Sequence, residues 1–189
     1  MKKCIIIVFL FVVFSSCKKS NVSSVDSSLI TNAPIIANQL KLSGNGFSNN
    51  GLYPKLYTCD GLGISPGFQW LDAPSTTTNY AITMHTIPPT GDKHVYFVLY
   101  NIPATTSSIP DNSKSIGIFG INTVDGKTTY TPPCSQGPGA KTYIITLYAL
   151  NGPPTITVPN NQVTMDILLA GMKNKIVDSA VMSVTYTKP

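Results

Sequence analysis

The stretch that decides the fold runs from Tyr130 to Leu150 and reads YTPPCSQGPGAKTYIITLYAL. Its first half is rich in proline and glycine, which restrict or free the backbone and so favour a shaped, irregular loop. Its second half, from Thr142 to Leu150, is apolar or aromatic on both faces, which is typical of a central strand in a buried sheet. Because rigid loops at sheet edges often line small pockets, this loop is the first candidate for a functional site.

Other segments of the chain also predict strands. They are rich in β-branched and aromatic residues and are separated by clusters of Gly, Pro, Asn, Asp and Ser. These segments are Phe68–Leu71, Tyr80–His85, His94–Ile102 and Val181–Tyr186. One late helix is predicted, with Thr164 as its N-cap and Lys173 near its end. The sequence therefore predicts a mostly β domain with antiparallel strands and a C-terminal helix packed against them.

The N-terminus has the pattern of a bacterial export signal. Lys2 and Lys3 precede an apolar run, Ile5 to Phe14, and two serines then lead to Cys17. This arrangement resembles a lipobox and predicts cleavage before Cys17 and lipidation of that cysteine. An ordinary signal peptide or an uncleaved anchor are the alternatives. The expected organisation is a signal peptide at 1–16, a polar lipidated tether at 17–39 and one domain at 40–189.

The charges exclude some classes of function. The formal net charge is +5, and it becomes +3 (11 Lys against 8 Asp) once Lys2 and Lys3 are removed with the signal. The lysines are scattered and form no stripe that would follow a phosphate backbone, so nucleic-acid binding is not expected. The chain contains no Arg and no Glu. Any chemistry must therefore use Asp, His, Lys, Tyr, Ser or Cys.

Two cysteines remain in the domain after processing, Cys59 and Cys134. In an exported protein such a pair can form a disulfide. The alternative is two small buried hydrophobic side chains that never meet. The sequence leaves both open, because it does not supply the Cα separation that a disulfide needs.

A series of short motifs spans the domain from about Leu40 to Tyr186. In order, they are Tyr57-Thr58-Cys59-Asp60-Gly61, Ser65-Pro66, Trp70, Ala81-Ile82-Thr83-Met84, Pro89-Thr90-Gly91, Leu99-Tyr100-Asn101-Ile102-Pro103, Pro133-Cys134, Thr146-Leu147-Tyr148-Ala149-Leu150 and Leu168-Leu169-Ala170-Gly171-Met172. This order resembles the phosphatidylethanolamine-binding protein family, in its bacterial Raf-kinase-inhibitor-like branch. The resemblance implies a large antiparallel sheet packed on a smaller one, with a pocket at one edge for a phospholipid head group or similar small anion.

The polar residues that line this pocket in the family are replaced here. The resemblance places His85 and Ile87 at the positions of two aspartates in a proline-rich turn, and Tyr96 at the position of a strand histidine. Lys141 stands for a histidine and Thr142 for an arginine in the last motif. The motifs of the scaffold are kept while the polar lining changes. We therefore expect a retained cavity with altered chemistry.

The candidate ligand-binding residues come from the turn, the strands and the proline-rich loop. They are His85, Pro89, Tyr96, Pro133, Cys134, Ser135, Lys141 and Tyr143. Lys141 can attract an anion, and His85 can donate, accept or carry charge near neutral pH. The alternatives are a free surface lysine, a surface or hydrogen-bonded histidine, and tyrosines that only pack.

These features predict a non-catalytic, lipid-anchored protein of the bacterial cell envelope, facing the periplasm, that binds a small anion or phospholipid head group. A second hypothesis is a small hydrolase or isomerase that uses His85 and Lys141. A third is an envelope module that binds or inhibits a protein partner. No cofactor or metal is expected, since the two histidines have no recognised ligand spacing and no P-loop or common hydrolase motif occurs.

Overall fold

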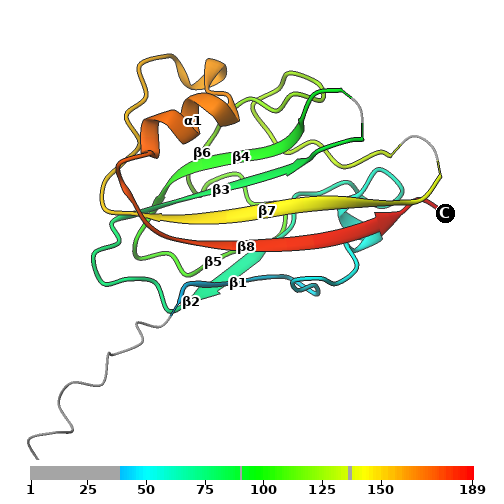
Figure 1. The fold of residues 1–189 in the computed structure, drawn as a ribbon, viewed down its shortest axis with the longest axis horizontal. Helices are drawn as coiled ribbons and strands as arrows, with labels where there is room; N and C mark the ends of the chain where they lie inside the picture. The colour runs from blue at the N-terminus through cyan, green and yellow to red at the C-terminus, as the bar shows by residue number, and fades with distance from the viewer. Residues whose placement is uncertain (1–38, 90, 136–137) are drawn as a thin grey trace, which may run out of the picture. The chain divides into compact units, whose positions relative to one another are not determined.

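Two antiparallel β-sheets packed face to face form the body of the protein (Figure 1). The computed structural model describes residues 39–89, 91–135 and 138–189. In that part of the chain the smaller sheet has the order β1-β2-β5, and the larger has the order β6-β4-β3-β7-β8. The strands are β1 (Lys41–Gly44), β2 (Phe68–Leu71), β3 (Asn79–Thr86), β4 (His94–Pro103), β5 (Ser108–Ile109), β6 (Ile118–Phe119), β7 (Ala140–Leu150) and β8 (Ile176–Thr187). The helical elements are α1 (Met165–Met172) and two short 3-10 helices, Lys55–Tyr57 and Asn160–Gln162.

The predicted fold class is confirmed: a large antiparallel sheet packs on a smaller one, and one α-helix comes late in the described chain. β2 has the predicted bounds, and β7 is an interior strand of the large sheet between β3 and β8. β8 begins at Ile176, earlier than the predicted start at Val181. It pairs with β7 along that strand's whole length, so the ladder extends β8 across Asp178 and Ser179, the two polar residues that interrupt the apolar pattern before Val181.

The main core lies between the two sheets. Alternate residues of β3, such as Ile82 and Met84, and of β7, such as Tyr143 and Ile145, bury their side chains there. This alternation is the two-residue period of a strand. Burying a large apolar side chain contributes roughly 1.5–3 kcal/mol relative to leaving it exposed, so the two central strands hold the sheets together.

Helix α1 covers part of the outer face of the large sheet (Figure 1). Leu168 and Met172 of the helix pack in one buried cluster with Val98 of β4. As predicted, Thr164 is the N-cap, and its Oγ1 accepts a hydrogen bond of 3.2 Å from the amide of Ile167. The helix therefore leaves the opposite face of the large sheet free to pack on the small sheet.

The predicted signal peptide, Cys17 and most of the tether lie outside the described residues. Among the residues that are described, no helix is both long and apolar enough to cross a membrane.

Candidate functional site

A cavity lies where three neighbouring strands of the large sheet end or begin. Thr86, the last residue of β3, pairs with His94, the first residue of β4. β7 begins beside them at Ala140, on the other side of β3. The cavity has a volume of about 420 Å³, which is within the usual range for small-molecule sites. Its lining residues are Thr86, Ile87, Pro88, Pro89, His94, Tyr96, Cys134, Ser135, Ala140, Lys141, Thr142 and Tyr143.

Lys141 is the cation that β7 presents to this cavity. It lies two residues before Tyr143, whose side chain is buried between the sheets, so strand alternation turns Lys141 to the same side. Its side chain is half-buried. Within the described part of the chain, its ammonium has no ion pair or hydrogen bond, and the cavity lining contains no carboxylate. A partly desolvated, unpaired ammonium in a hollow favours an anionic ligand.

A β-bulge places Tyr96 in the cavity. In the β3–β4 ladder, Met84 pairs with Phe97 while the next residue, His85, pairs with Val95, so Tyr96 is the extra residue. As a result, Tyr96 and Phe97 both belong to the core between the sheets. Together with strand alternation, the bulge turns the side chains of Tyr96 and His94 toward the cavity, which both residues line.

Tyr96 and Tyr143 form an aromatic wall of the cavity. Their rings pack edge to face, with centroids 5.5 Å apart. Burial raises the pKa of both phenols, and the proximity of Tyr96 raises the pKa of Tyr143 further. Both hydroxyls therefore stay protonated near neutral pH and can act as hydrogen-bond donors.

Another part of the lining, a second wall, is the loop that ends with Cys134 and Ser135. Cys134 is bonded to Cys59 by a disulfide, with their Cα atoms 5.2 Å apart. Ser135 is half-buried, and its Oγ is shielded from solvent without a hydrogen-bond partner in the described structure. A buried hydroxyl without a partner is costly, so a ligand that accepts its hydrogen bond would be stabilised.

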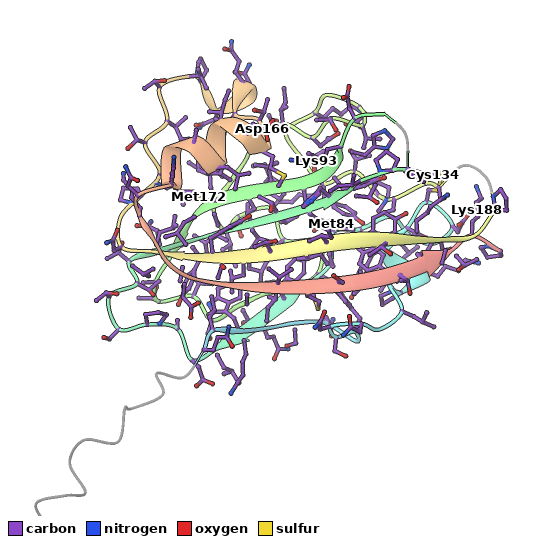
Figure 2. All side chains as sticks on the ribbon, viewed as in Figure 1. Met84, Lys93, Cys134, Asp166, Met172 and Lys188 are labelled. Carbon is purple, nitrogen blue, oxygen red and sulfur yellow. A yellow bond between two sulfur atoms is a disulfide. The ribbon has the colours of Figure 1, made fainter. Side chains whose placement is uncertain are left out.

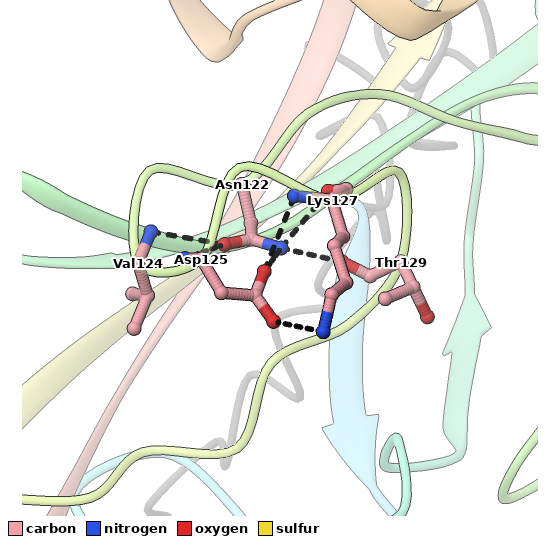
Figure 3. A network of polar contacts seen from close by, with 5 residues as sticks. All are labelled: Asn122, Val124, Asp125, Lys127 and Thr129. Carbon is pink, nitrogen blue, oxygen red and sulfur yellow. Dashed lines mark hydrogen bonds and ion pairs between the residues drawn. The ribbon is translucent and has the colours of Figure 1, made fainter.

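A turn held by Asn122 supports this wall and the start of β4 (Figure 3). The side-chain amide of Asn122 donates to Oδ1 of Asp125 and to two backbone carbonyls, and its oxygen accepts two backbone amides. The next residue, Thr123, accepts a hydrogen bond of 2.8 Å from the amide of Val95. This turn was not predicted from the sequence, although Asn122 and the Asp125-Gly126 pair are typical turn residues.

Most of the predicted ligand-binding residues lie together in the cavity. Those in its lining are Pro89, Tyr96, Cys134, Ser135, Lys141 and Tyr143. Pro133 and His85 are not part of the lining. Thr86 and His94 were not among the predicted ligand-binding residues; His94 is exposed, but it also lines the cavity.

His85 lies on the other face of the large sheet. Its neighbour Met84 faces the core between the sheets, so alternation turns His85 toward the side that carries α1. There, burial lowers the pKa of His85, and the ammonium of Lys93 lowers it further. Lys93 is itself 3.7 Å from Asp166 of α1, and Figure 2 shows both on that side. His85 and Lys141 therefore do not converge on one site, as the hydrolase or isomerase hypothesis requires.

A second hollow, of about 410 Å³, lies over the small sheet and is lined in part by Lys41, Trp70 and Leu71. Lys41 forms an ion pair of 2.7 Å with Asp72, so its charge is largely neutralised. The cavity at Lys141 is therefore the better candidate for an anion. Among the described residues, no group of three or more His, Cys, Asp or Glu side chains is arranged to hold a metal ion.

Comparison with known proteins agrees with this architecture. Residues 43–187 match the family model described as phosphatidylethanolamine-binding protein. A UPF0098 protein of Chlamydia muridarum is 30% identical over 154 residues, which cover 78% of this chain and 98% of the relative. A UPF0098 protein of Chlamydia pneumoniae is 28% identical over 157 residues, covering 79% and 99% of the two chains.

Two solved structures are similar to this fold. The putative phosphatidylethanolamine-binding protein homologue CT736 of Chlamydia trachomatis has a TM-score of 0.73 and 27% identity, over 80% of this chain and 99% of its own. The E. coli protein YbcL has a TM-score of 0.70 and 19% identity with the same coverage, which shows likeness of fold alone. From the family match and this architecture, the chain belongs to the phosphatidylethanolamine-binding protein family.

Proposed function

We propose that the protein binds a small anion, such as a phosphate or a phosphomonoester, in the cavity at Lys141, without catalysing a reaction. The observation that carries this proposal is the half-buried side chain of Lys141, which lines a cavity with no carboxylate in its lining. A hydrogen bond to a charged group contributes about 1.5–3 kcal/mol, roughly twice the value for neutral partners. Lys141 is therefore the residue on which affinity depends most.

Other donors complement the ammonium. The Oγ of Ser135 has no partner among the described residues, and the phenols of Tyr96 and Tyr143, whose pKa burial raises further above neutrality, are protonated donors. His94 lines the same cavity and adds a ring N–H. An anion between these groups would accept hydrogen bonds from both walls.

The missing carboxylate also favours a ligand without an amine. An ethanolamine head group carries an ammonium beside its phosphate, and that ammonium needs an acidic or strongly polar partner when it is desolvated. The lining offers Lys141 and His94 but no acid. Inorganic phosphate and phosphomonoesters without an amine should therefore bind at least as tightly as phosphoethanolamine.

The experiment is calorimetric titration of the full chain with inorganic phosphate and with phosphoethanolamine. Lys141→Met should weaken phosphate binding about 10-fold to 100-fold, in line with the loss of one charge-assisted hydrogen bond. The matched control is Lys173→Met, which removes the same charge at the exposed end of α1 and should leave affinity unchanged.

Equal affinity in Lys141→Met and in the unaltered chain would contradict the proposal. Binding only to vesicles that contain phosphatidylethanolamine, with none to free phosphate, would assign the cavity to a lipid head group. Turnover of a phosphomonoester would support an enzyme, and capture of an envelope protein that survives Lys141→Met would support an interaction module.

The proposed location is the cell envelope, with the chain anchored through Cys17. This proposal rests on the N-terminal sequence, in which two lysines, an apolar run and two serines precede that cysteine. Labelling of cells with a radioactive fatty acid should mark the protein, and Cys17→Ser should abolish the label. A Cys17→Ser protein that still carries the label and stays in the membrane fraction would contradict this anchor.

A further inference from the structure

We infer that the Cys59–Cys134 disulfide is a redox control on the cavity: it holds one wall in place, and its reduction releases that wall. This inference rests on the proposed anion binding, because it concerns the regulation of the same site. It starts from the position of Cys134, which is both a cavity-lining residue and one half of the disulfide.

Few backbone hydrogen bonds hold the wall. The amide of Thr131 donates to the carbonyl of Tyr96, and the carbonyl of Pro133 accepts from the amide of Cys59, each at 3.0 Å. Pro132 and Pro133 have no N–H to donate. Beyond Pro133, neither Cys134 nor Ser135 has a backbone hydrogen bond to the rest of the described chain. The disulfide is therefore the main interaction that holds Cys134 and Ser135 in place beside the cavity.

Cys59 belongs to a segment that hydrogen bonds hold in place without the disulfide. The hydroxyl of Tyr57 lies 3.0 Å from both the carbonyl of Asn45 and Oδ1 of Asp111, which share its one hydrogen. Thr58 is fully buried, and its hydroxyl donates to a backbone carbonyl at 2.9 Å. On the other side of Cys59, Asp60 accepts a hydrogen bond of 2.8 Å from Tyr186 of β8. Opening the disulfide should therefore free Cys134 while Cys59 stays in place.

Release of Cys134 acts on the proposed site through Ser135. The Oγ of Ser135, which has no partner among the described residues, keeps its place in the cavity that Lys141 and Tyr143 also line only as long as the wall is held. If the wall is mobile, a ligand must order it before the hydroxyl of Ser135 can donate a hydrogen bond. This ordering costs conformational entropy and weakens binding. A mobile wall also admits water beside Lys141, which weakens the attraction to an anion.

A reductant can reach this disulfide, since both cysteines are exposed. A thiolate of a dithiol reductant attacks one of the two sulfurs, breaks the S–S bond and forms a mixed disulfide. The second thiol of the reductant then resolves that intermediate. The reductant leaves as a disulfide, and Cys59 and Cys134 each become a thiol, so two electrons and two protons have passed to the protein.

The test compares phosphate affinity in the oxidised chain, in the chain reduced with dithiothreitol and in the chain after reoxidation. Cys4→Ser and Cys17→Ser are introduced so that only the two cysteines of the domain react. Reduction should weaken phosphate binding at least 10-fold, and reoxidation should restore it. The variant with both Cys59→Ser and Cys134→Ser should bind as weakly as the reduced chain and should not respond to dithiothreitol.

Amide chemical shifts provide a second readout that needs no ligand. On reduction, changes should be confined to the surroundings of Cys59, to the wall and to the cavity residues His94, Tyr96 and Lys141. If the oxidised chain binds no phosphate, the proposed function fails, while these shifts still decide whether the disulfide holds the wall. Unchanged shifts at these cavity residues, affinities within twofold in both states, or a loss of the whole β-sheet circular dichroism signal on reduction would each overturn the inference.

Discussion

The side-chain nitrogen of Asn122 lies 2.7 Å from Oδ1 of Asp125, and this contact closes the turn that supports the cavity (Figure 3). Asn122 is almost completely buried, and its side chain uses both its donor and its acceptor groups within residues 122–129. Because Thr123 in the same turn contacts β4, the turn links the wall of the cavity to the strand that carries Tyr96.

Replacing Asn122 should therefore destabilise the domain. Asn122→Ala removes the side-chain partner of several partly buried backbone amides and carbonyls, and it should lower the free energy of unfolding by about 2–3 kcal/mol. Asp125→Asn is the matched control, because it keeps an oxygen acceptor and should cost less. Chemical denaturation measures both variants. A loss below about 0.5 kcal/mol for Asn122→Ala would show that the network contributes little.

The carboxyl group of Asp125 should titrate at unusually low pH. Hydrogen bonding from Asn122, in the first place, lowers the pKa of Asp125 from 3.8 to about 2. Because the folded-state pKa is below the unfolded value, the carboxylate stabilises the fold above about pH 4, and this contribution is lost as the pH falls toward 2. NMR titration of the side-chain carbon should show the low midpoint, and Asn122→Ala should move it upward.

His85 should make the fold less stable in mild acid. Burial, and then Lys93, lower the pKa of His85 below 6.5, so the unfolded chain binds the proton more readily than the folded chain. Stability should therefore fall as the pH drops below about 6.5. His85→Gln should flatten this part of the profile, whereas His94→Gln, at an exposed position, should leave it intact. The same slope in both variants would rule out His85 as its source.

The disulfide should contribute to global stability as well as to the cavity wall. Cys59 and Cys134 are 75 residues apart in the chain, so the bond removes much conformational freedom from the unfolded state. Its removal in a variant with Cys59→Ser and Cys134→Ser should lower the free energy of unfolding by about 2–4 kcal/mol and leave a folded domain. Thermal unfolding with and without dithiothreitol checks this value, and a melting temperature that reductant does not change would contradict it.

Much of the fold could be predicted from local patterns. Long apolar segments such as Thr142–Leu150 and the N-cap at Thr164 carry strong signals, and the order of motifs identified the family. The two-residue strands β5 and β6 were not predicted, because such short segments have no periodicity to detect. They form only where the neighbouring strands offer open hydrogen-bonding edges.

The cavity was less predictable because side-chain direction depends on register. The bulge at Tyr96 and the alternation in β3 decide that Thr86 and His94 line the cavity while His85 does not. The pairing of Cys59 with Cys134 likewise depends on a distance between loops that the sequence does not contain. The residue types indicated the chemistry of the site, but the register of the β-strands determines which side chains line the cavity.

The most direct test of anion binding at Lys141 is a crystal grown without phosphate or sulfate and soaked in tungstate, a tetrahedral oxyanion with a strong anomalous signal. We expect an anomalous peak inside the cavity, within hydrogen-bond distance of the ammonium of Lys141 and the hydroxyl of Ser135, and its loss in crystals of Lys141→Met. Peaks confined to exposed lysines elsewhere, with none in the cavity, would contradict the proposed function.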